Sequence, residues 1–391
     1  MPTPRRIDLR ILLVRFTSHP IFVRCADEIH IFAETIGGEL EPPNCTQPLP
    51  STCLVDSPFH HCEVTMKAIV IDHFGPGLDS LVIKDLPQPV PENGDVLIQI
   101  KAFGVNHAEM HMRRGEWPEA AYVSGIECVG IVAACPGGEF PIGAKVAAAM
   151  GGLGRTRNGS YAEYTCAPAG NVAGIDAPLS WAELAAIPES YTTAWTALFR
   201  NLELKAGEML VIRGATSALG KAALNLAVTA GAKVIATSRD PVRFQALLDA
   251  GAVKVEREGP DLASRLPEAG AKQVDKVLNL VGNSALLDSI KIPRRGGKVC
   301  QAGWLGSLAP VKDFDPMTQM ASGVDFNLFG SWVFGEPEFP LHDVPLKSIA
   351  ADVAASKFEA KPARVFQFEE ISEAHKLMQE NKANGKMVVL V

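Results

Sequence analysis

Long apolar runs, dense basic clusters and paired cysteines are all missing from this chain. No stretch of about 18 apolar residues occurs, which argues against a transmembrane helix. Lys and Arg form no dense run and the formal net charge is −7, so nothing supports nucleic-acid binding. None of the eight cysteines stands in a C-x-x-C pair, which favours reduced, buried thiols in a cytoplasmic protein over a disulfide framework.

The composition is that of an ordinary globular protein. Hydrophobic residues make up 47% and charged residues 21% of the 391 positions. This length is enough for two domains of roughly 100–200 residues each.

Residues 1–65 differ in character from the rest of the chain. They show no sustained hydrophobic periodicity and are interrupted by several prolines. Acidic side chains outnumber the arginines there, which argues against an organelle transit peptide. We expect a disordered N-terminal extension, with the functional chain starting at Met66; a regulatory or targeting arm is the alternative.

The segment from Met66 to about residue 190 is predicted to be all-β and rich in turns. Strand-like runs are separated by joints that contain proline and glycine. From about residue 184 strands and helices alternate, which predicts a doubly wound parallel sheet with helices on both faces. We expect its strands at 209–213, 233–237, 275–281 and 297–302, and its helices at 220–230, 241–250, 260–269 and 284–290.

Mixed character returns after about residue 325. Helices are expected at 349–355 and 371–381, and a strand at 364–368. A last strand at 386–391 is expected to rejoin the β-rich region. The predicted domains are therefore 191–324 for nucleotide binding, and 66–190 together with 325–391 for the β-rich domain.

The turn after the strand at 209–213 is the strongest candidate for a dinucleotide site. The full G-x-G-x-x-G fingerprint is absent, but Gly214 and Gly220 remain, with small residues between them. Small residues let the backbone approach a pyrophosphate at a helix start, and the Ser217 hydroxyl can donate to it.

The next strand ends in Ser238-Arg239, where an NAD-selective protein usually carries an acidic residue. An arginine there suits a 2′-phosphate, so the sequence favours NADPH over NADH. Asp240 offers the competing interpretation of an acidic partner for the ribose. However, Asp240 before Pro241 also fits a helix N-cap followed by a proline at the first helical position.

Taken together, these segments resemble the zinc-independent quinone oxidoreductases of the medium-chain dehydrogenase/reductase superfamily. The resemblance covers about residues 66–391. It implies a Rossmann domain inserted in a β-rich, chaperonin-10-like (GroES-like) catalytic domain. The matching segments are 104–106, 161–164, 187–195, 214–220, 236–239, 279–282 and 385–389.

The zinc positions of related alcohol dehydrogenases are altered in this chain. Asn106 and Ile126 stand where those enzymes carry cysteine and histidine, and neither side chain can replace a thiolate or an imidazole at zinc. The four-cysteine structural zinc lobe is also missing. We therefore expect no metal, and a conjugated acceptor whose charge spreads without a Lewis acid.

The resemblance also implies roles for individual residues. Asn106 lies at the junction of nicotinamide and substrate, Thr193 contacts the nicotinamide side and Lys386 is a basic residue near the cofactor. Asn106 as a helix cap and Thr193 as an ordinary helical residue are the structural alternatives. The predicted cofactor-binding residues are Gly214, Ser217, Ala218, Leu219, Gly220, Ser238, Arg239, Arg243, Asn279, Val281, Gly303, Leu305 and Lys386.

The tyrosine that serves as proton donor in related enoyl reductases is replaced by Trp117, and an indole is not a general acid. Proton delivery is left to water, Tyr122 or Tyr191. The Trp117 ring could stack on a flat acceptor or belong to the core.

The sequence thus predicts an NADPH-dependent oxidoreductase of quinones or α,β-unsaturated carbonyls. One alternative is an enoyl-thioester reductase of fatty-acid or polyketide metabolism, for which Arg113, Arg114, Arg155 and Arg157 would form the basic entry. The other is a non-catalytic NADPH-binding sensor or structural protein. The resemblance further suggests a homodimer or homotetramer.

Overall fold

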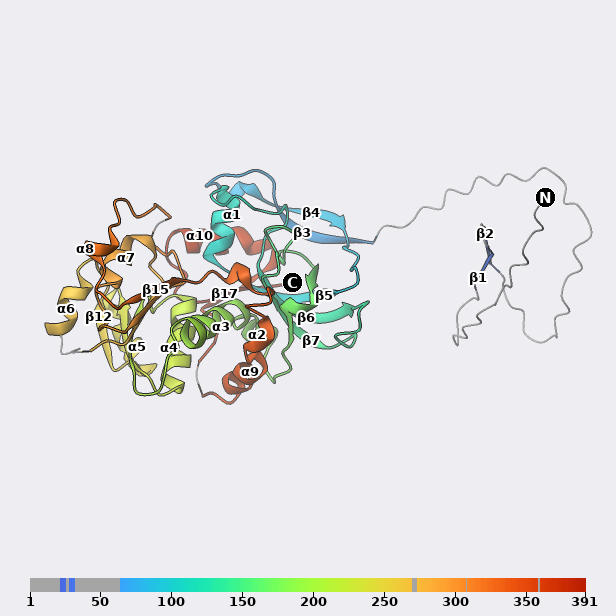
Figure 1. Cartoon of the computed structure of the whole chain (residues 1–391). Coiled ribbons are helices and arrows are strands. Elements are labelled where there is room, and N and C mark those ends of the chain that lie inside the picture. The colour runs from blue at the N-terminus through green and yellow to red at the C-terminus, as the bar shows by residue number, and fades with distance from the viewer. Residues whose placement is uncertain (1–21, 26–27, 32–63, 269–272, 307, 358) are drawn as a thin grey trace, which may run out of the picture. The chain divides into compact units, whose positions relative to one another are not determined.

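The computed structural model describes residues 22–25, 28–31, 64–268, 273–306, 308–357 and 359–391 (Figure 1). The chain divides into two compact units, Met1–His61 and Cys62–Val391. In the first unit, β1 (Phe22–Cys25) and β2 (Glu28–Ile31) form an antiparallel pair. Residues 64 and 65 of the predicted extension are also described, and Thr65 begins β3 (Thr65–Ile71), one residue before the predicted start at Met66. The rest of the predicted extension lies outside the described residues.

The β-rich part of the second unit is built on a seven-stranded sheet with the order β16-β17-β5-β6-β7-β9, in which β8 also pairs with β5. A separate antiparallel pair is formed by β3 (Thr65–Ile71) and β4 (Leu81–Pro87). The strands of the large sheet are β5 (Asp95–Val105), β6 (Glu127–Ala134), β7 (Lys145–Ala149), β8 (Tyr164–Pro168), β9 (Val172–Gly174), β16 (Arg364–Gln367) and β17 (Met387–Leu390).

The return of the last strand to this sheet is confirmed. β17 runs antiparallel to β5, with Val388 opposite Gly104. The all-β prediction for this region was incomplete, because the helix α1 (His107–Arg114) follows β5 directly. Asn106 is the N-cap of α1 and forms a capping box with Glu109. The alternative interpretation of Asn106 as a helix cap is therefore confirmed.

The second sheet is parallel and six-stranded, with the order β12-β11-β10-β13-β14-β15. Its two outermost strands were not predicted. Each of them carries charged or polar residues at alternate positions and lies at a sheet edge, so the apolar run typical of a buried strand is missing. The strands are β10 (Met209–Arg213), β11 (Lys233–Ser238), β12 (Lys254–Arg257), β13 (Lys276–Asn279), β14 (Lys298–Gln301) and β15 (Asp325–Leu328).

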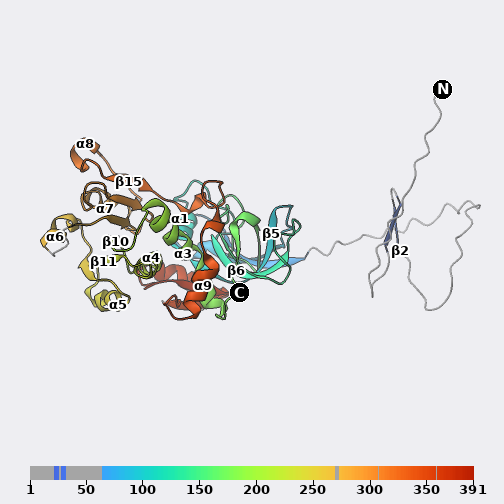
Figure 2. The ribbon, with the colours of Figure 1, turned by 60° about the horizontal axis from the view of Figure 1, so that its bottom comes forward.

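Helices cover both faces of the parallel sheet, and Figure 2 shows α4 and α5 on one side of β10 and β11 and α7 on the other. Alternate residues of β10 explain this arrangement. Leu210 and Ile212 belong to the same core cluster as Ala223 of α4, whereas Val211 packs in a second cluster with Leu286 of α7.

The remaining helices complete the second unit. Over the described residues, no helix combines the length and apolar character needed to cross a bilayer. The helices after α1 are α2 (Trp181–Ala185), α3 (Pro188–Trp195), α4 (Ala218–Thr229), α5 (Phe244–Asp249), α6 (Leu262–Glu268), α7 (Asn283–Ser289), α8 (Pro316–Gln319), α9 (Leu346–Ala354) and α10 (Ile371–Gln379).

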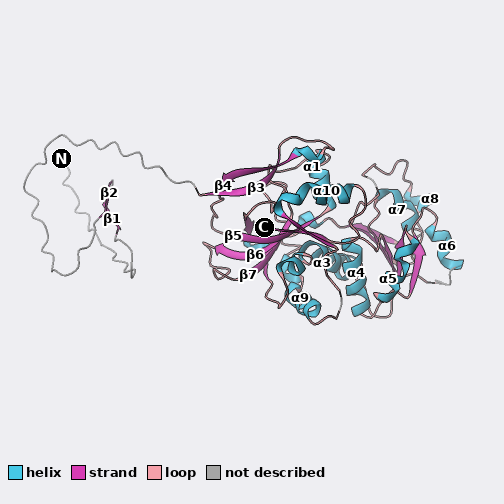
Figure 3. Cartoon of the chain, turned by 180° about the vertical axis from the view of Figure 1, so that it is seen from behind, coloured by secondary structure: helices cyan, strands magenta, loops and turns pink. Residues whose placement is uncertain are grey.

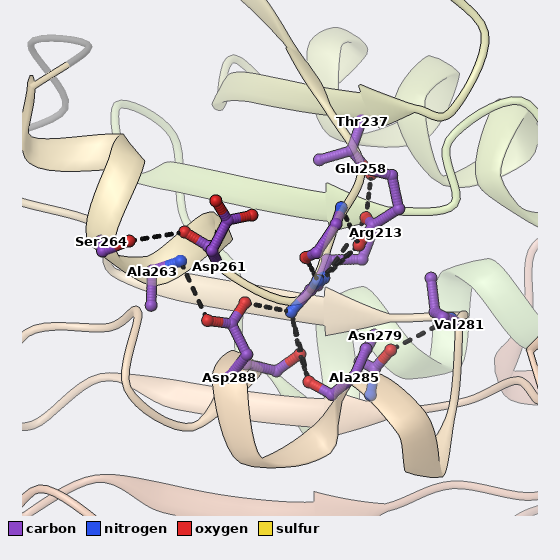
Figure 4. A network of polar contacts seen from close by, with 12 residues as sticks. Arg213, Thr237, Glu258, Asp261, Ala263, Ser264, Asn279, Val281, Ala285 and Asp288 are labelled. Carbon is purple, nitrogen blue, oxygen red and sulfur yellow. Dashed lines mark hydrogen bonds and ion pairs between the residues drawn. The ribbon is translucent and has the colours of Figure 1, made fainter.

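A buried arginine joins the carboxyl ends of the parallel strands (Figure 4). The Arg213 side chain is fully buried at the end of β10 and forms ion pairs with the carboxylates of Glu258 and Asp288. Its Nη1 lies 2.7 Å from Asp288 Oδ2 and its Nη2 donates to the Gly259 carbonyl at 2.7 Å. The Arg213 guanidinium therefore connects the segment after β12 with α7. Arg213 directly precedes the turn that begins at Gly214.

Replacing Arg213 by methionine should lower the free energy of unfolding by about 3 kcal/mol, because two partly buried carboxylates lose their fully buried counter-charge. Denaturant unfolding at neutral pH measures the change. Arg295→Met, at an exposed arginine, is the matched control. A loss for Arg213→Met no larger than that of the control would show that the buried network contributes little.

Candidate functional site

A single pocket brings together most of the residues predicted for the site. Its walls come from the end of β5 and α1, from α3, from the turn before α4 and from the carboxyl ends of β11, β13 and β14. Figure 3 shows α3 and α4 between the two sheets that supply these walls. The predicted residues that line the pocket are Asn106, Trp117, Thr193, Gly214, Ser217, Ala218, Leu219, Ser238, Arg239, Arg243, Val281, Gly303 and Leu305.

The turn between β10 and α4 has the geometry of a pyrophosphate cradle. Gly214 has a φ of 82°, which L-residues rarely adopt, and a Cβ there would lie 2.9 Å from Leu305 Cδ1. A Cβ on Gly220 would collide with the Gly214 carbonyl, so this glycine lets the helix start pack closely on the turn. Gly220 itself lies outside the pocket lining.

Backbone N–H groups are available at the start of α4. Ser217 is the N-cap: its hydroxyl accepts from the Gly220 N–H at 3.0 Å and donates to the Gly214 carbonyl at 2.9 Å. The N–H groups of Ala218 and Leu219 have no acceptor in the part of the chain that the structure describes. The helix start therefore fits a phosphate group, whereas the Ser217 hydroxyl is already used within the turn.

The tip of β11 presents a positive charge to the same pocket. Arg239 is exposed, and within the described residues no carboxylate pairs with its guanidinium. Asp240 lies outside the lining: its carboxylate accepts from the Val242 N–H at 3.1 Å, with Pro241 at the first helical position. The N-cap interpretation of Asp240 is thus confirmed. Arg243, which lies 3.4 Å from the Asp240 carboxylate, also bonds the side chain of Asn384.

Asn279 lies outside the pocket, although it was predicted to bind the cofactor. Its Oδ1 accepts from the N–H groups of Val281 and Gly282, both at 3.0 Å, and its Nδ2 donates to the Gly282 carbonyl at 3.0 Å. The buried amide therefore closes the turn after β13 and sets the position of Val281, which does line the pocket.

Lys386 also lies behind the wall, where it holds Asn106. Its ammonium donates to Asn106 Oδ1 at 2.6 Å and forms an ion pair with Glu127, which is fully buried in β6. The Asn106 amide donates to Glu127 at 2.9 Å and to Glu109 at 3.2 Å. Asn106 is therefore fixed from three sides, and both its amide donor bonds go to protein carboxylates.

Glu189 was not among the predicted site residues. It is the second residue of α3, lines the pocket and accepts hydrogen bonds at Oε1 from Thr193 at 2.9 Å and Ser331 at 2.6 Å. Within the described part of the chain its Oε2 has no partner. Burial, with repulsion from Glu127, raises the pKa of Glu189 to about 8. The signal in the sequence was a carboxylate inside the otherwise uncharged segment 187–195.

Glu109 is a third buried carboxyl group in this region. Burial raises its pKa to about 7, while Lys386 and the Asn106 amide act in the opposite direction.

The two tyrosines considered as proton donors both lie outside the pocket. The buried Tyr191 hydroxyl accepts from Asn225 at 3.0 Å, and burial raises its pKa to about 12. Tyr122 is exposed, and its hydroxyl accepts from Lys84 at 3.1 Å. These positions exclude direct proton delivery from either side chain.

Two pairs of stacked rings line the pocket. Trp117 lies against His111 with ring centroids 5.8 Å apart and planes 14° apart, so its ring does belong to the pocket wall. Trp304 lies against Trp332 at 6.0 Å and 29°. This second pair was not predicted, because nothing in the sequence places residue 304 beside residue 332. Flat, apolar walls of this kind suit a planar ligand.

Over the described residues, no group of three or more histidine, cysteine, aspartate or glutamate side chains is arranged to hold a metal ion.

Comparisons with known proteins agree with this architecture. The alcohol dehydrogenase GroES-like domain matches residues 92–190, and the zinc-binding dehydrogenase family matches residues 218–346. The quinone oxidoreductase of Lama guanicoe is 28% identical over 337 residues, which span 83% of this chain and 98% of that protein.

Solved structures show the same fold. The quinone oxidoreductase from Coxiella burnetii superposes with a TM-score of 0.70 at 25% identity, covering 84% of this chain and all of that one. A mycobacterial protein complexed with NADPH superposes at 0.73 and 24% identity, covering 83% of this chain and 100% of its own. The chain is thus an oxidoreductase with a nicotinamide cofactor, and it belongs to the quinone oxidoreductase-like family of the medium-chain dehydrogenase/reductase superfamily.

Proposed function

We propose that this protein transfers hydride from NADPH to a quinone or an α,β-unsaturated carbonyl compound without a metal ion. The observation that carries the proposal is that one pocket joins a helix start, and an arginine that pairs with no carboxylate among the described residues, to aromatic walls. In this proposal the cofactor is held by residues 191–324 together with β15, which belongs to the same sheet. The acceptor is held by residues 66–190 and the segment that follows β15.

Two positive features of the pocket support NADPH as the cofactor: the N–H groups at the start of α4 and the guanidinium of Arg239 at the end of β11. The N–H groups of Ala218 and Leu219 would hold the pyrophosphate, and the Arg239 guanidinium, beside Ser238, would hold the 2′-phosphate. The Asp240 carboxylate, which would repel such a phosphate, is held by the Val242 N–H. When bound, NADPH supplies a hydride from its nicotinamide ring.

The acceptor proposal rests on the chemistry of the opposite wall. Trp117 and Trp304 offer flat apolar surfaces, and the hydroxyls of Thr193 and Ser331 stand beside them in the lining. A conjugated acceptor spreads the incoming negative charge over its own π system, so a hydroxyl that turns from Glu189 to the acceptor can take the place of a Lewis acid. Asn106 lines the pocket, but in this proposal it does not donate to the acceptor, because its amide already donates to Glu109 and Glu127.

The enoyl-thioester alternative has less support, because its proposed basic entry is occupied by other contacts. Three of the arginines lie within ion-pair distance of a carboxylate, at 2.7 to 3.7 Å, and the fourth is buried against backbone carbonyls and Gln379. These side chains are Arg114, Arg155 and Arg157, and the buried Arg113.

The proposal extends to assembly and location. A homodimer or homotetramer would cover the outer edge of β15, which ends the parallel sheet and pairs with no further strand in the described ranges of the chain. The free thiols of Cys128, Cys135, Cys166 and Cys300 suit a reducing cytoplasm.

Reversing the charge at Arg239 should identify the cofactor. Arg239→Glu should weaken NADPH binding by about 1–3 kcal/mol, the scale of one charge-assisted hydrogen bond, and shift preference toward NADH. Calorimetric titration of both coenzymes measures the shift, with Arg295→Glu as the control at an exposed arginine. Equal losses in the two variants would remove Arg239 from the phosphate site.

Turnover should survive exhaustive removal of metals. The decay of NADPH absorbance with a panel of quinones and enones should proceed at the same rate before and after dialysis against a strong chelator. Activity that disappears on chelation and returns with zinc would contradict metal-free hydride transfer. NADPH binding without turnover on any acceptor would favour the sensor alternative.

A further inference from the structure

Glu189 places a carboxyl group against the acceptor side of the pocket. We propose that Glu189 is the proton source of the reaction and that it delivers its proton through the Ser331 hydroxyl. The inference rests on the proposed function, since a proton source is needed only where an acceptor is reduced.

The surroundings of Glu189 favour its neutral form. The titratable groups that act on it are Glu127 of β6 and Lys386, which precedes β17. Lys386 is already paired with Glu127 and also acts on the nearby Glu109. One ammonium thus serves three buried carboxyl groups, and Glu189 is the one that keeps an oxygen without any partner in the described part of the chain. With a pKa of about 8, Glu189 carries a proton at neutral pH.

The route to the pocket runs through Ser331. Its Oγ lies 2.6 Å from Glu189 Oε1, a distance typical of strong O–H···O hydrogen bonds, and Ser331 is half-buried in the pocket lining. A hydroxyl can accept one proton while it gives up another, so it can relay a proton from a carboxyl group that is itself out of reach. A ligand in the pocket cannot contact Glu189 Oε2 directly, because this atom is completely buried. Thr193, which bonds the same carboxyl oxygen at 2.9 Å, holds Glu189 in place.

The proposed step balances in electrons and protons. The acceptor gains a hydride, hence two electrons, at the β-carbon of an enone or on the quinone ring system, and becomes an enolate or a hydroquinone anion. The Ser331 hydroxyl, which donates to Glu189 Oε1 in the structure, turns toward the acceptor and gives its proton to the α-carbon or oxygen. Ser331 Oγ then takes the proton that Glu189 carries on Oε1. Glu189 is left as a carboxylate and regains its proton from water after the product leaves.

The variant Glu189→Gln tests the proposal, because an amide keeps the shape and the hydrogen bonds to Thr193 and Ser331 but cannot release a proton. We expect kcat to fall about 100-fold, the usual contribution of a general acid, while NADPH affinity is unchanged. Wild-type kcat should decline as the pH rises through about 8, where Glu189 loses its proton, and the variant should lack this decline.

Three further variants separate proton delivery from general damage. Ser331→Ala should lose activity to a similar extent, and Ser331→Thr, which keeps a hydroxyl, should restore it. Glu92→Gln makes the same substitution at an exposed site and should behave as wild type. Retention of the wild-type rate and pH profile by Glu189→Gln, or by Ser331→Ala, would overturn the proposed route.

Two measurements need no turnover. The infrared difference spectrum between the wild type and Glu189→Gln should show one protonated carboxyl band, which belongs to Glu189. The raised pKa also makes a stability prediction, because the folded protein holds this proton to higher pH than the unfolded chain does. As the pH rises from about 4.5 to about 8, the wild type should therefore lose stability relative to Glu189→Gln, measured as a growing difference in Tm.

The outcomes distinguish this inference from the proposed function. A wild type that reduces quinones or enones beside an equally active Glu189→Gln variant would overturn the proton route alone. A wild type that reduces no acceptor would overturn both.

Discussion

The buried ion pair between Lys386 and Glu127 is the contact on which the arrangement of the pocket depends. It joins the segment before β17 to β6, and it fixes Asn106 at the end of β5 through both partners. Room for the pair exists because residue 104 is glycine, where a Cβ would collide with the Glu127 carboxylate and the Lys386 side chain. A buried charge is tolerated only when it is paired, so loss of either partner would leave the other in an apolar environment.

The same pair determines the charge balance of its neighbours. Glu109 and Glu189 lie close enough to Lys386 to be influenced by it, yet the ammonium is committed to Glu127. Burial therefore dominates for both carboxyl groups and raises the pKa of each. One cation among three buried acids thus leaves the pKa of the carboxyl group at the pocket wall above its usual range.

The sequence predicted the parallel sheet well where strands are apolar. β10 was predicted with its observed bounds, and the turn from Gly214 to Gly220 was identified from its small residues. Prediction was poorest at the sheet edges, where β12 and β15 carry charged residues, and β15 extends the sheet beyond residue 324, the predicted domain boundary. The hydrophobic pattern that predicts a strand is strong in β10, which is buried on both faces, and weak in the edge strands β12 and β15, which are partly exposed.

For the site, the sequence identified residue types but not their partners. Asn279 and Lys386 were expected at the cofactor, and both instead hold neighbouring pocket residues from behind. Arg213 was counted as part of an apolar strand, and only its contacts with Glu258 and Asp288 explain a buried guanidinium there. Glu189 was missed because its environment is made by residues that are distant in the sequence. Glu127 lies 62 positions before it and Ser331 lies 142 positions after it.

The distance along the chain between Glu127 and Lys386 has a consequence for biosynthesis. These two residues are 259 positions apart, so the parallel sheet between them can pair fully while Lys386 is still inside the ribosome. Until that lysine emerges, Glu127 has no counter-ion and β5 lacks its neighbour β17. The nascent protein would therefore pair its parallel sheet first and complete the surroundings of Asn106 last.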